Sequence, residues 1–214
     1  MAGSNPGSKQ EKINIKKFYL AKVTTDELIS LIHATPKYYS GVQECSITLE
    51  YIEDEAFAEG QKVVDDAMIN GGTIDITLNQ LSNEERAEIL AYIERSTGSS
   101  VNVLTDSKEK SFFAVGYEVE FADGSIRYRW WYKTNPVLQS DSLSVTQSTN
   151  DVNRQSDIVR FNLLKTFYEI DKTSSGQKVK LFGKTAQTDD PNYDVEGDTW
   201  FDDVTPYNSV VPTP

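Results

Sequence analysis

The chain has 214 residues, enough for one domain with a sizeable core, and its 38% hydrophobic and 11% aromatic content argues against disorder of the whole chain. No run of about 18 apolar residues is present, which excludes a membrane-spanning helix, and the single cysteine, Cys45, excludes an internal disulfide and agrees with a reducing compartment. The net charge of −12 argues against a protein that grips nucleic acid, because phosphate binding requires clustered lysines and arginines.

The first third of the chain predicts strands around one long irregular segment. Residues 1–12 are polar and lack the apolar segment of a secretory signal, so we expect folding in a cytoplasm. Lys17–Val23 reads as a strand, and apolar residues alternate with polar ones over Ile47–Tyr51 and again over Ile74–Leu78. Glu53–Gly72 has no clear period and predicts either a long exposed loop or a hairpin arm, which is either a functional arm or a disordered insertion.

One helix is predicted after these strands. Ser82 and Glu85 form a capping box, and an apolar stripe at helical spacing follows it. The stripe consists of Ile89, Leu90 and Ile93. We expect a helix over about Asn83–Arg95, ended by Gly98, that buries this stripe against a sheet.

The clearest local signal is a β-hairpin. Apolar residues alternate along Phe113–Phe121 and along Ile126–Trp130, Asp123-Gly124 suits a two-residue turn, and Pro136 is expected to end the return strand. The other face of the return strand carries Arg127, Arg129, Trp131 and Lys133. This face is either exposed to solvent or part of an interface, because Arg and Trp are enriched where subunits meet.

The remainder predicts a loop, a last strand and a tail. Gln139–Gln155 reads as a loop with a weak strand near Leu143–Val145, and Val159 begins a strand that runs to about Ile170. Beyond Asp171 the chain is polar, and seven acidic residues and no basic one follow Lys184, which predicts a flexible or partner-docked tail.

These elements predict a mainly β fold, a β-sandwich or partly closed barrel with one flanking α-helix, a long inter-strand loop and an extended C-terminal tail. The expected organisation is a flexible N-terminal segment (1–14), a β-sandwich domain (15–171) and an acidic polar C-terminal extension (172–214).

No group of residues predicts catalysis, a cofactor or a metal. His33 is the only histidine, and neither a Gly-x-Ser-x-Gly elbow nor a phosphate-binding glycine loop is present. Asp190–Asp194 matches only the beginning of a calcium loop. A hydrolase that uses Glu118 and Glu120 as paired carboxylates is the weakest hypothesis, so we expect no enzyme.

Four segments, taken in order, resemble a known family: Lys17–Val23, Gly41–Glu59, Gly72–Leu90 and Phe113–Lys133. The ordered set, which covers roughly Lys17 to Asp171, is similar to the major tail proteins (tail tube proteins) of long-tailed siphophages that infect Gram-positive hosts, the phi13-type grouping.

The resemblance implies a structural virion protein of the phage tail, made in the host cytoplasm. Six copies would form a ring, and rings would stack into the tube through which the genome is ejected. Its partners would be itself, a tape measure protein inside the tube, and tail terminator and distal tail proteins at the ends. DNA would pass without specific binding, since an acidic lumen repels phosphates, and no cofactor or membrane is involved. The candidates for contacts between subunits and between rings are Glu53, Asp54, Glu55, Phe57, Arg127, Arg129, Trp131 and Lys133.

Two alternatives stay open. One is a non-catalytic binding or adhesion β-sandwich, in which exposed aromatic residues stack on sugar rings; the candidates are Trp131, Tyr132 and Trp200. The other is a tail terminator or completion protein that forms a single ring.

Overall fold

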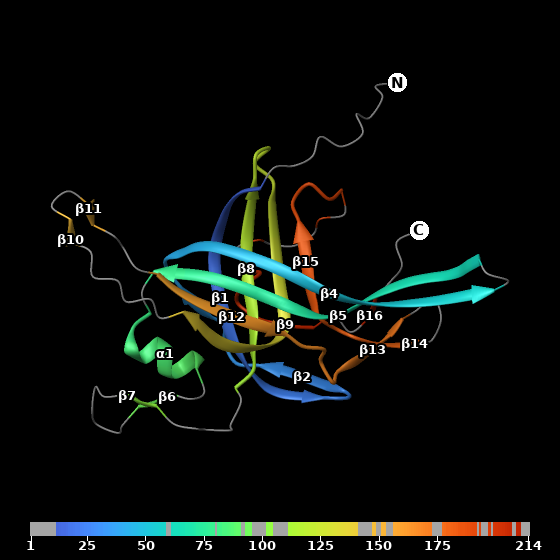
Figure 1. The fold of residues 1–214 in the computed structure, drawn as a ribbon, viewed down its shortest axis with the longest axis horizontal. Coiled ribbons are helices and arrows are strands. Elements are labelled where there is room, and N and C mark those ends of the chain that lie inside the picture. The colour runs from blue at the N-terminus through green and yellow to red at the C-terminus, as the bar shows by residue number, and fades with distance from the viewer. Residues whose placement is uncertain are drawn as a thin grey trace.

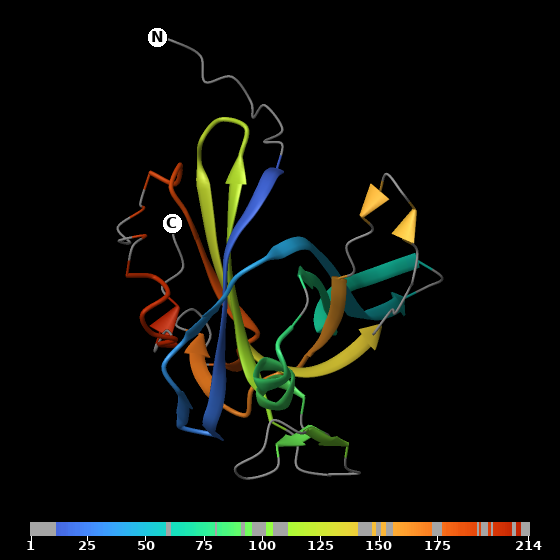
Figure 2. The same ribbon diagram turned by 90° about the vertical axis from the view of Figure 1, so that its left-hand side faces the viewer.

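A computed structural model describes residues 12–58, 61–79, 81–90, 93–95, 102–104, 111–140, 147–148, 151–152, 156–172, 177–191, 193, 197, 199–206 and 209–210. Most of these residues lie in an antiparallel nine-stranded sheet, which confirms the predicted mainly β class with one short helix (Figures 1 and 2). The strands of this sheet are β1 (Lys12–Glu27), β2 (Ser30–His33), β3 (Lys37–Tyr39), β4 (Val42–Ala58), β5 (Gln61–Asn79), β8 (Phe113–Phe121), β9 (Ile126–Ser140), β12 (Ser156–Leu163) and β15 (Gly183–Gln187). Smaller sheets pair β6 (Ile93–Arg95) with β7 (Asn102–Leu104), β10 (Gln147–Ser148) with β11 (Asp151–Val152), and β13 (Glu169–Lys172) with β14 (Gln177–Lys180) and β16 (Ser209–Val210).

The large sheet folds over itself at β9. One edge of β9 pairs with β15 over residues 127–131 and with β12 over residues 134–140, while its other edge pairs with β8. In Figure 1 the strands β12, β5 and β4 therefore cross the direction of β1, β8 and β9. The two parts face each other as the layers of a sandwich, and the sheet does not close into a barrel.

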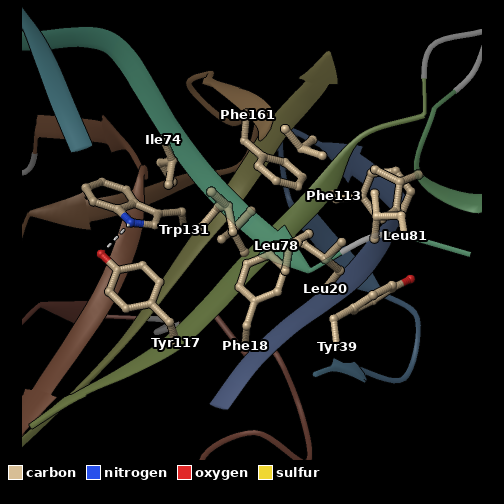
Figure 3. Close-up of a cluster of buried hydrophobic side chains, with 14 of the residues drawn as sticks. Phe18, Leu20, Tyr39, Ile74, Leu78, Leu81, Phe113, Tyr117, Trp131 and Phe161 are labelled. Atoms are coloured by element: carbon tan, nitrogen blue, oxygen red, sulfur yellow. Dashed lines mark hydrogen bonds between the residues drawn. The ribbon is translucent and has the colours of Figure 1, made fainter. Parts of the chain in front are cut away.

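The first hydrophobic core lies between these two layers (Figure 3). Ile74 and Phe161 from the crossing strands meet Phe18 and Trp131 from the other layer, and the rings of Phe18 and Phe161 are 6.2 Å apart. The predicted alternation over Ile74–Leu78 is confirmed, because its three aliphatic side chains are buried and the two residues between them are half-buried.

A second core covers the opposite face of β1, β8 and β9. Trp130 and Tyr132 pack here against Trp200 and Phe201, and the indole N–H of Trp130 donates a 3.1 Å hydrogen bond to the carbonyl oxygen of Trp200. Phe201 also stacks on Tyr19, with ring centroids 4.6 Å apart. Both faces of the β8–β9 hairpin are therefore covered.

This second core corrects the interpretation of the C-terminal segment. Residues 177–191 and 199–206 do not form a free tail, because β15 joins the large sheet and Trp200, Phe201 and Val204 are buried. The segment is poor in aliphatic residues, but a few aromatic side chains suffice to anchor it. Residues 192, 194–196 and 198, which carry several of the predicted acids, lie outside the described residues. Where the chain divides into domains stays a prediction.

Helix α1 (Asn83–Ile89) begins as predicted and ends early. The capping box of Ser82 and Glu85 is present, but Leu90 already has extended backbone angles and Ile93 lies in β6. Ile89 and Leu90 are both fully buried in the first core. Neighbouring side chains of a helix point about 100° apart, so the change to an extended backbone at Leu90 allows both to enter the core.

The predicted hairpin is confirmed, and its turn and its end differ from the prediction. The backbone N–H of Phe121 donates to the carbonyl of Ser125, which leaves a loop of three residues in which only Gly124 has a positive φ (+82°). Pro136 does not end β9, because it pairs with Phe161 of β12. A proline is tolerated there since the pairing of β9 with β8 extends only to Thr134, so no β8 residue needs its missing N–H.

The last predicted strand is shorter than expected. β12 ends at Leu163, and the chain resumes an extended course only in β13, because Thr166 bonds the backbone of Tyr168 and Leu181 instead of a neighbouring strand. The weak strand predicted near Leu143–Val145 lies outside the described residues, as do residues 1–11 of the predicted N-terminal segment.

Candidate assembly surfaces

The predicted loop or arm of Glu53–Gly72 is a two-stranded ribbon. Residues 51–58 of β4 pair with residues 61–69 of β5, so the loop interpretation is wrong and the hairpin arm is confirmed. In Figure 1 the ribbon extends past the other strands on the right-hand side. At about 3.3 Å per residue, its eight β4 residues span roughly 26 Å.

Glycines set the base of this ribbon. Gly72 has φ +148°, and a Cβ atom there would lie 2.3 Å from the carbonyl oxygen of Thr48. The pairing shifts register between Glu50 and Tyr51, and β12 accompanies β5 only as far as Gly72. Beyond this point no strand among the described residues pairs with either outer edge of the ribbon. An isolated two-stranded hairpin is marginally stable in water, and open edges invite pairing with another chain.

Four of the predicted contact residues lie on the β4 strand of the ribbon: Glu53, Asp54, Glu55 and Phe57. The register pairs Asp54 with Asp66 and Glu55 with Asp65. Residues 53–66 contain six acidic residues and one lysine. Like charges at directly opposite positions destabilise a strand pair. A cationic partner would therefore stabilise the ribbon.

Exposed apolar side chains mark the beginning of the ribbon. Ile52 and Met68 are cross-strand partners and are 48% and 61% exposed, and the neighbouring Tyr51 is 55% exposed. We call Tyr51, Ile52 and Met68 the ribbon patch. Exposed apolar residues that adjoin one another are typical of contact sites between proteins.

A second apolar patch lies at the β1–β2 turn. Its residues, the turn patch, are Leu28, Ile29, Ile32 and Phe167. Ile29 is 86% exposed, although turns usually carry Gly, Asn, Asp, Pro or Ser. None of the predicted contact residues belongs to this patch. Its signal in the sequence is the apolar pair Leu28-Ile29 between the polar residues Glu27 and Ser30.

Two of the predicted interface residues, Trp131 and Lys133, are buried inside the chain. Lys133 is 7% exposed, and its Nζ lies 2.6 Å from Asp26 Oδ2. The other oxygen of Asp26 accepts the backbone N–H groups of Phe167 and Tyr168. Trp131 is 6% exposed and donates its indole N–H to the Tyr117 hydroxyl at 3.2 Å (Figure 3). A solvent-exposed face is therefore the wrong interpretation of these two positions.

Arg127 and Arg129 are different, because they line an open groove. The groove has a volume of about 280 Å³ and continues the first core toward the β8–β9 turn. We call it the arginine groove. Its lining comes from four strands and consists of Asn14, Ile15, Gln43, Glu44, Cys45, Ile47, Tyr117, Val119, Arg127 and Arg129.

The hypothetical carboxylate pair of a hydrolase is engaged in ion pairs. Glu118 is 3% exposed and lies 3.1 Å from Lys17 Nζ, while Glu120 lies 2.7 Å from Lys16 Nζ. A bulge in β1 puts Lys17 at φ +49° and brings both lysines opposite β8. These carboxylates join two strands, and a substrate would not reach Glu118 without displacing its lysine.

The sugar-stacking alternative is also not supported. Trp131, Tyr132 and Trp200 are 6%, 1% and 6% exposed, so none offers a ring face to a ligand. Within the described part of the chain, no three His, Cys, Asp or Glu side chains are grouped so that they could hold a metal ion. No helix of that part has both the length and the apolar character needed to span a bilayer.

Comparison with known proteins adds a structural likeness. No family model matches the sequence, and no curated protein is similar to it. Among solved structures, the chain is similar to one from the cryo-EM structure of the anti-feeding prophage (AFP) baseplate, 6-fold symmetrised, with 10% sequence identity and a TM-score of 0.38 over 86% of this chain and 97% of that chain.

Proposed function

We propose that this protein is a structural virion component without enzymatic activity, the major tail protein of a long-tailed bacteriophage. Six copies form a ring, and the rings stack into the tube through which the genome is ejected. The protein is made in the host cytoplasm and resides in the virion tail. Its partners are its own copies, a tape measure protein in the lumen, and terminator and distal tail proteins at the tube ends.

The observation that carries this proposal is the projecting ribbon. It leaves the body of the sandwich with two open edges among the described residues and with like charges at opposite positions, so it is incomplete in a single copy. Such a ribbon is well suited to continue or to clasp the sheet of a neighbour.

The positions of the two apolar patches support repeated assembly. The ribbon patch lies on the β4–β5 hairpin and the turn patch on the β1–β2 hairpin, which Figure 1 shows in different parts of the molecule. Contacts between two different surfaces of identical copies are heterologous, and they produce rings when the rotation closes and filaments when it does not. The order of the four family-like segments favours the ring and tube.

The experiment compares the assembly of the wild type with that of a variant in which a two-residue Asn-Gly turn replaces residues 53–66. Negative-stain electron microscopy and sedimentation velocity of the concentrated wild type should show rings or tubes, and the shortened variant should remain monomeric. Tyr38→Ser is the control and should assemble normally. It removes an aromatic residue outside both patches that is 53% exposed, close to the 55% of Tyr51 in the ribbon patch.

A wild type that stays monomeric at every concentration and salt condition would contradict the proposal. Single rings that never stack would instead support the terminator alternative.

A further inference from the structure

Two arginines of the arginine groove have no acidic partner in the part of the chain that the structure describes. No ion pair there reaches Arg127 or Arg129, although the chain has 33 acidic residues and only 21 basic ones. Glu44 also lines the groove, but its side chain is exposed and is not paired with either arginine. In a protein with this excess of acids, two neighbouring half-buried guanidinium groups without a carboxylate are unexpected.

Both guanidinium groups are held in position. The Nε of Arg127 donates a 2.7 Å hydrogen bond to Gln187, and its guanidinium lies 4.9 Å from the ring centre of Phe121. The guanidinium of Arg129 lies 5.1 Å from the ring centre of Trp131. Arg129 also makes a side-chain hydrogen bond to Tyr117. A guanidinium group has five N–H donors, so each arginine keeps further N–H groups that can bind a carboxylate.

The chain's own ribbon cannot supply that carboxylate. The groove is lined by Gln43–Cys45 near the start of β4, and the acidic positions Glu53–Glu55 lie near the end of the same strand. From Cys45 to Glu55 a continuous strand covers about 33 Å at 3.3 Å per residue. Only the ribbon of another copy can therefore bring these acids to the groove.

We propose that the arginine groove is the receptor for the acidic ribbon of a second copy, with Arg127 and Arg129 binding carboxylates of Glu53–Glu55 or of Asp65 and Asp66. The inference rests on the proposed self-assembly and names the pair of surfaces that meets. Because the groove and the ribbon lie at opposite ends of one strand, each copy donates a ribbon and accepts another, and the contact repeats without being self-complementary. The contact would bring cations to the like charges at the paired positions of the ribbon.

The experiment is a charge swap within one chain. Arg129→Glu reverses the groove, and Asp54→Lys with Glu55→Lys reverses the ribbon. Each variant should raise the protein concentration needed for assembly by about tenfold or more, as expected for close charge pairs across an interface. The chain that carries all three substitutions should assemble near the wild-type concentration. Lys22→Glu, an exposed charge reversal on β1 outside the groove, should assemble normally.

Folding is monitored by circular dichroism. If Arg129→Glu does not fold, Arg127→Glu takes its place, and the ribbon variant tests the contact with an intact groove. Assembly of the wild type should weaken with added salt, because ion pairs at a surface are screened.

Different failures have different meanings. If the wild type assembles and the groove variants assemble equally well, or if the ribbon variant is unaffected, the proposed contact is wrong while the self-assembly stands. If the groove and ribbon variants fail and the charge swap does not restore assembly, the pairing of these two surfaces is also wrong. A wild type that does not assemble overturns the proposed function itself.

Discussion

At the scale of single residues, buried polar groups join segments that are distant in sequence. Asp26 binds Lys133 of β9 and two backbone N–H groups of the segment before β13. The Nε2 atom of His33 lies 2.9 Å from the carbonyl oxygen of Tyr132. A carbonyl oxygen can only accept a hydrogen bond, so Nε2 carries the proton and donates it. Burial lowers the pKa of His33 below its ordinary value of 6.5, against the opposing effect of the nearby carbonyls.

His33 therefore predicts a pH dependence of stability. In the unfolded chain the imidazole takes up a proton as the pH falls through 6.5, whereas the folded state resists protonation until a lower pH. The unfolded state then binds more protons, so the free energy of unfolding should fall below pH 6.5, by at most about 1.4 kcal/mol per pH unit, until the folded pKa is reached.

Urea unfolding of the wild type and of His33→Gln at pH 7.5, 6.5 and 5.5 measures this difference. The glutamine keeps an N–H donor for the carbonyl oxygen of Tyr132 and does not titrate. The free energy of unfolding of His33→Gln should therefore lack the histidine contribution to the pH dependence. Because the chain has one histidine, an NMR titration reads its pKa directly. A folded pKa of 6.5 or above would contradict the expectation.

At the scale of elements, the molecule depends on where long strands change partners. β9 passes from β15 to β12 along one edge, and β5 passes from the body to the ribbon at Gly72. Gly72 and Gly124 both have a positive φ, but the space around them differs. Gly124 has φ +82°, and a Cβ atom there would meet no other atom within 4 Å, whereas Gly72 lies against the backbone of Thr48 and Leu49.

Substitution of these glycines should therefore separate strain from steric overlap. Gly124→Ala should cost about 1–2 kcal/mol, the strain of a left-handed backbone angle in a residue with a side chain. Gly72→Ala should cost more than that, since the backbone must also shift to relieve the contact with Thr48. Urea unfolding of both variants provides the comparison. Equal losses would show that the base of the ribbon relaxes freely.

At the scale of the whole molecule, the β8–β9 hairpin separates two cores and belongs to both. Val115 and Trp131 face the core between the layers, while Ala114 and Trp130 face the core that the C-terminal segment completes. The C-terminal segment is thus part of the folding unit, and loss of its aromatic anchor should weaken the whole sheet.

Phe201→Ala tests this coupling. Phe201 is 4% exposed and contacts Tyr19, Tyr128 and Trp130, so its truncation should lower the free energy of unfolding by about 3–5 kcal/mol. Circular dichroism and tryptophan fluorescence should report a single, coincident transition at a lower urea concentration. Ile29→Ala, at a residue that is 86% exposed, is the control and should change stability by less than about 0.5 kcal/mol. If the urea unfolding transition of the sheet stays unchanged, the C-terminal segment does not contribute to the stability of the sheet.

The sequence by itself determined the local elements of this protein. Alternation identified the strands around Ile74–Leu78 and Phe113–Phe121, and the capping box located the start of α1. These signals are reliable because they depend on neighbours within a few residues. The same local patterns wrongly predicted that the helix continues past Leu90 and that the return strand ends at Pro136. Both ends depend on contacts with distant residues, which the sequence around these positions does not show.

Only the tertiary structure decided which surfaces are inside and which are left open. It buried Trp131 and Lys133, left Arg127 and Arg129 in a groove, and joined the C-terminal aromatic residues to a second core. An alternating strand shows that its two faces differ, but not which face meets another layer, because that depends on strand pairing between residues far apart in the chain. In this protein the folding of one sheet over itself at β9 made that choice.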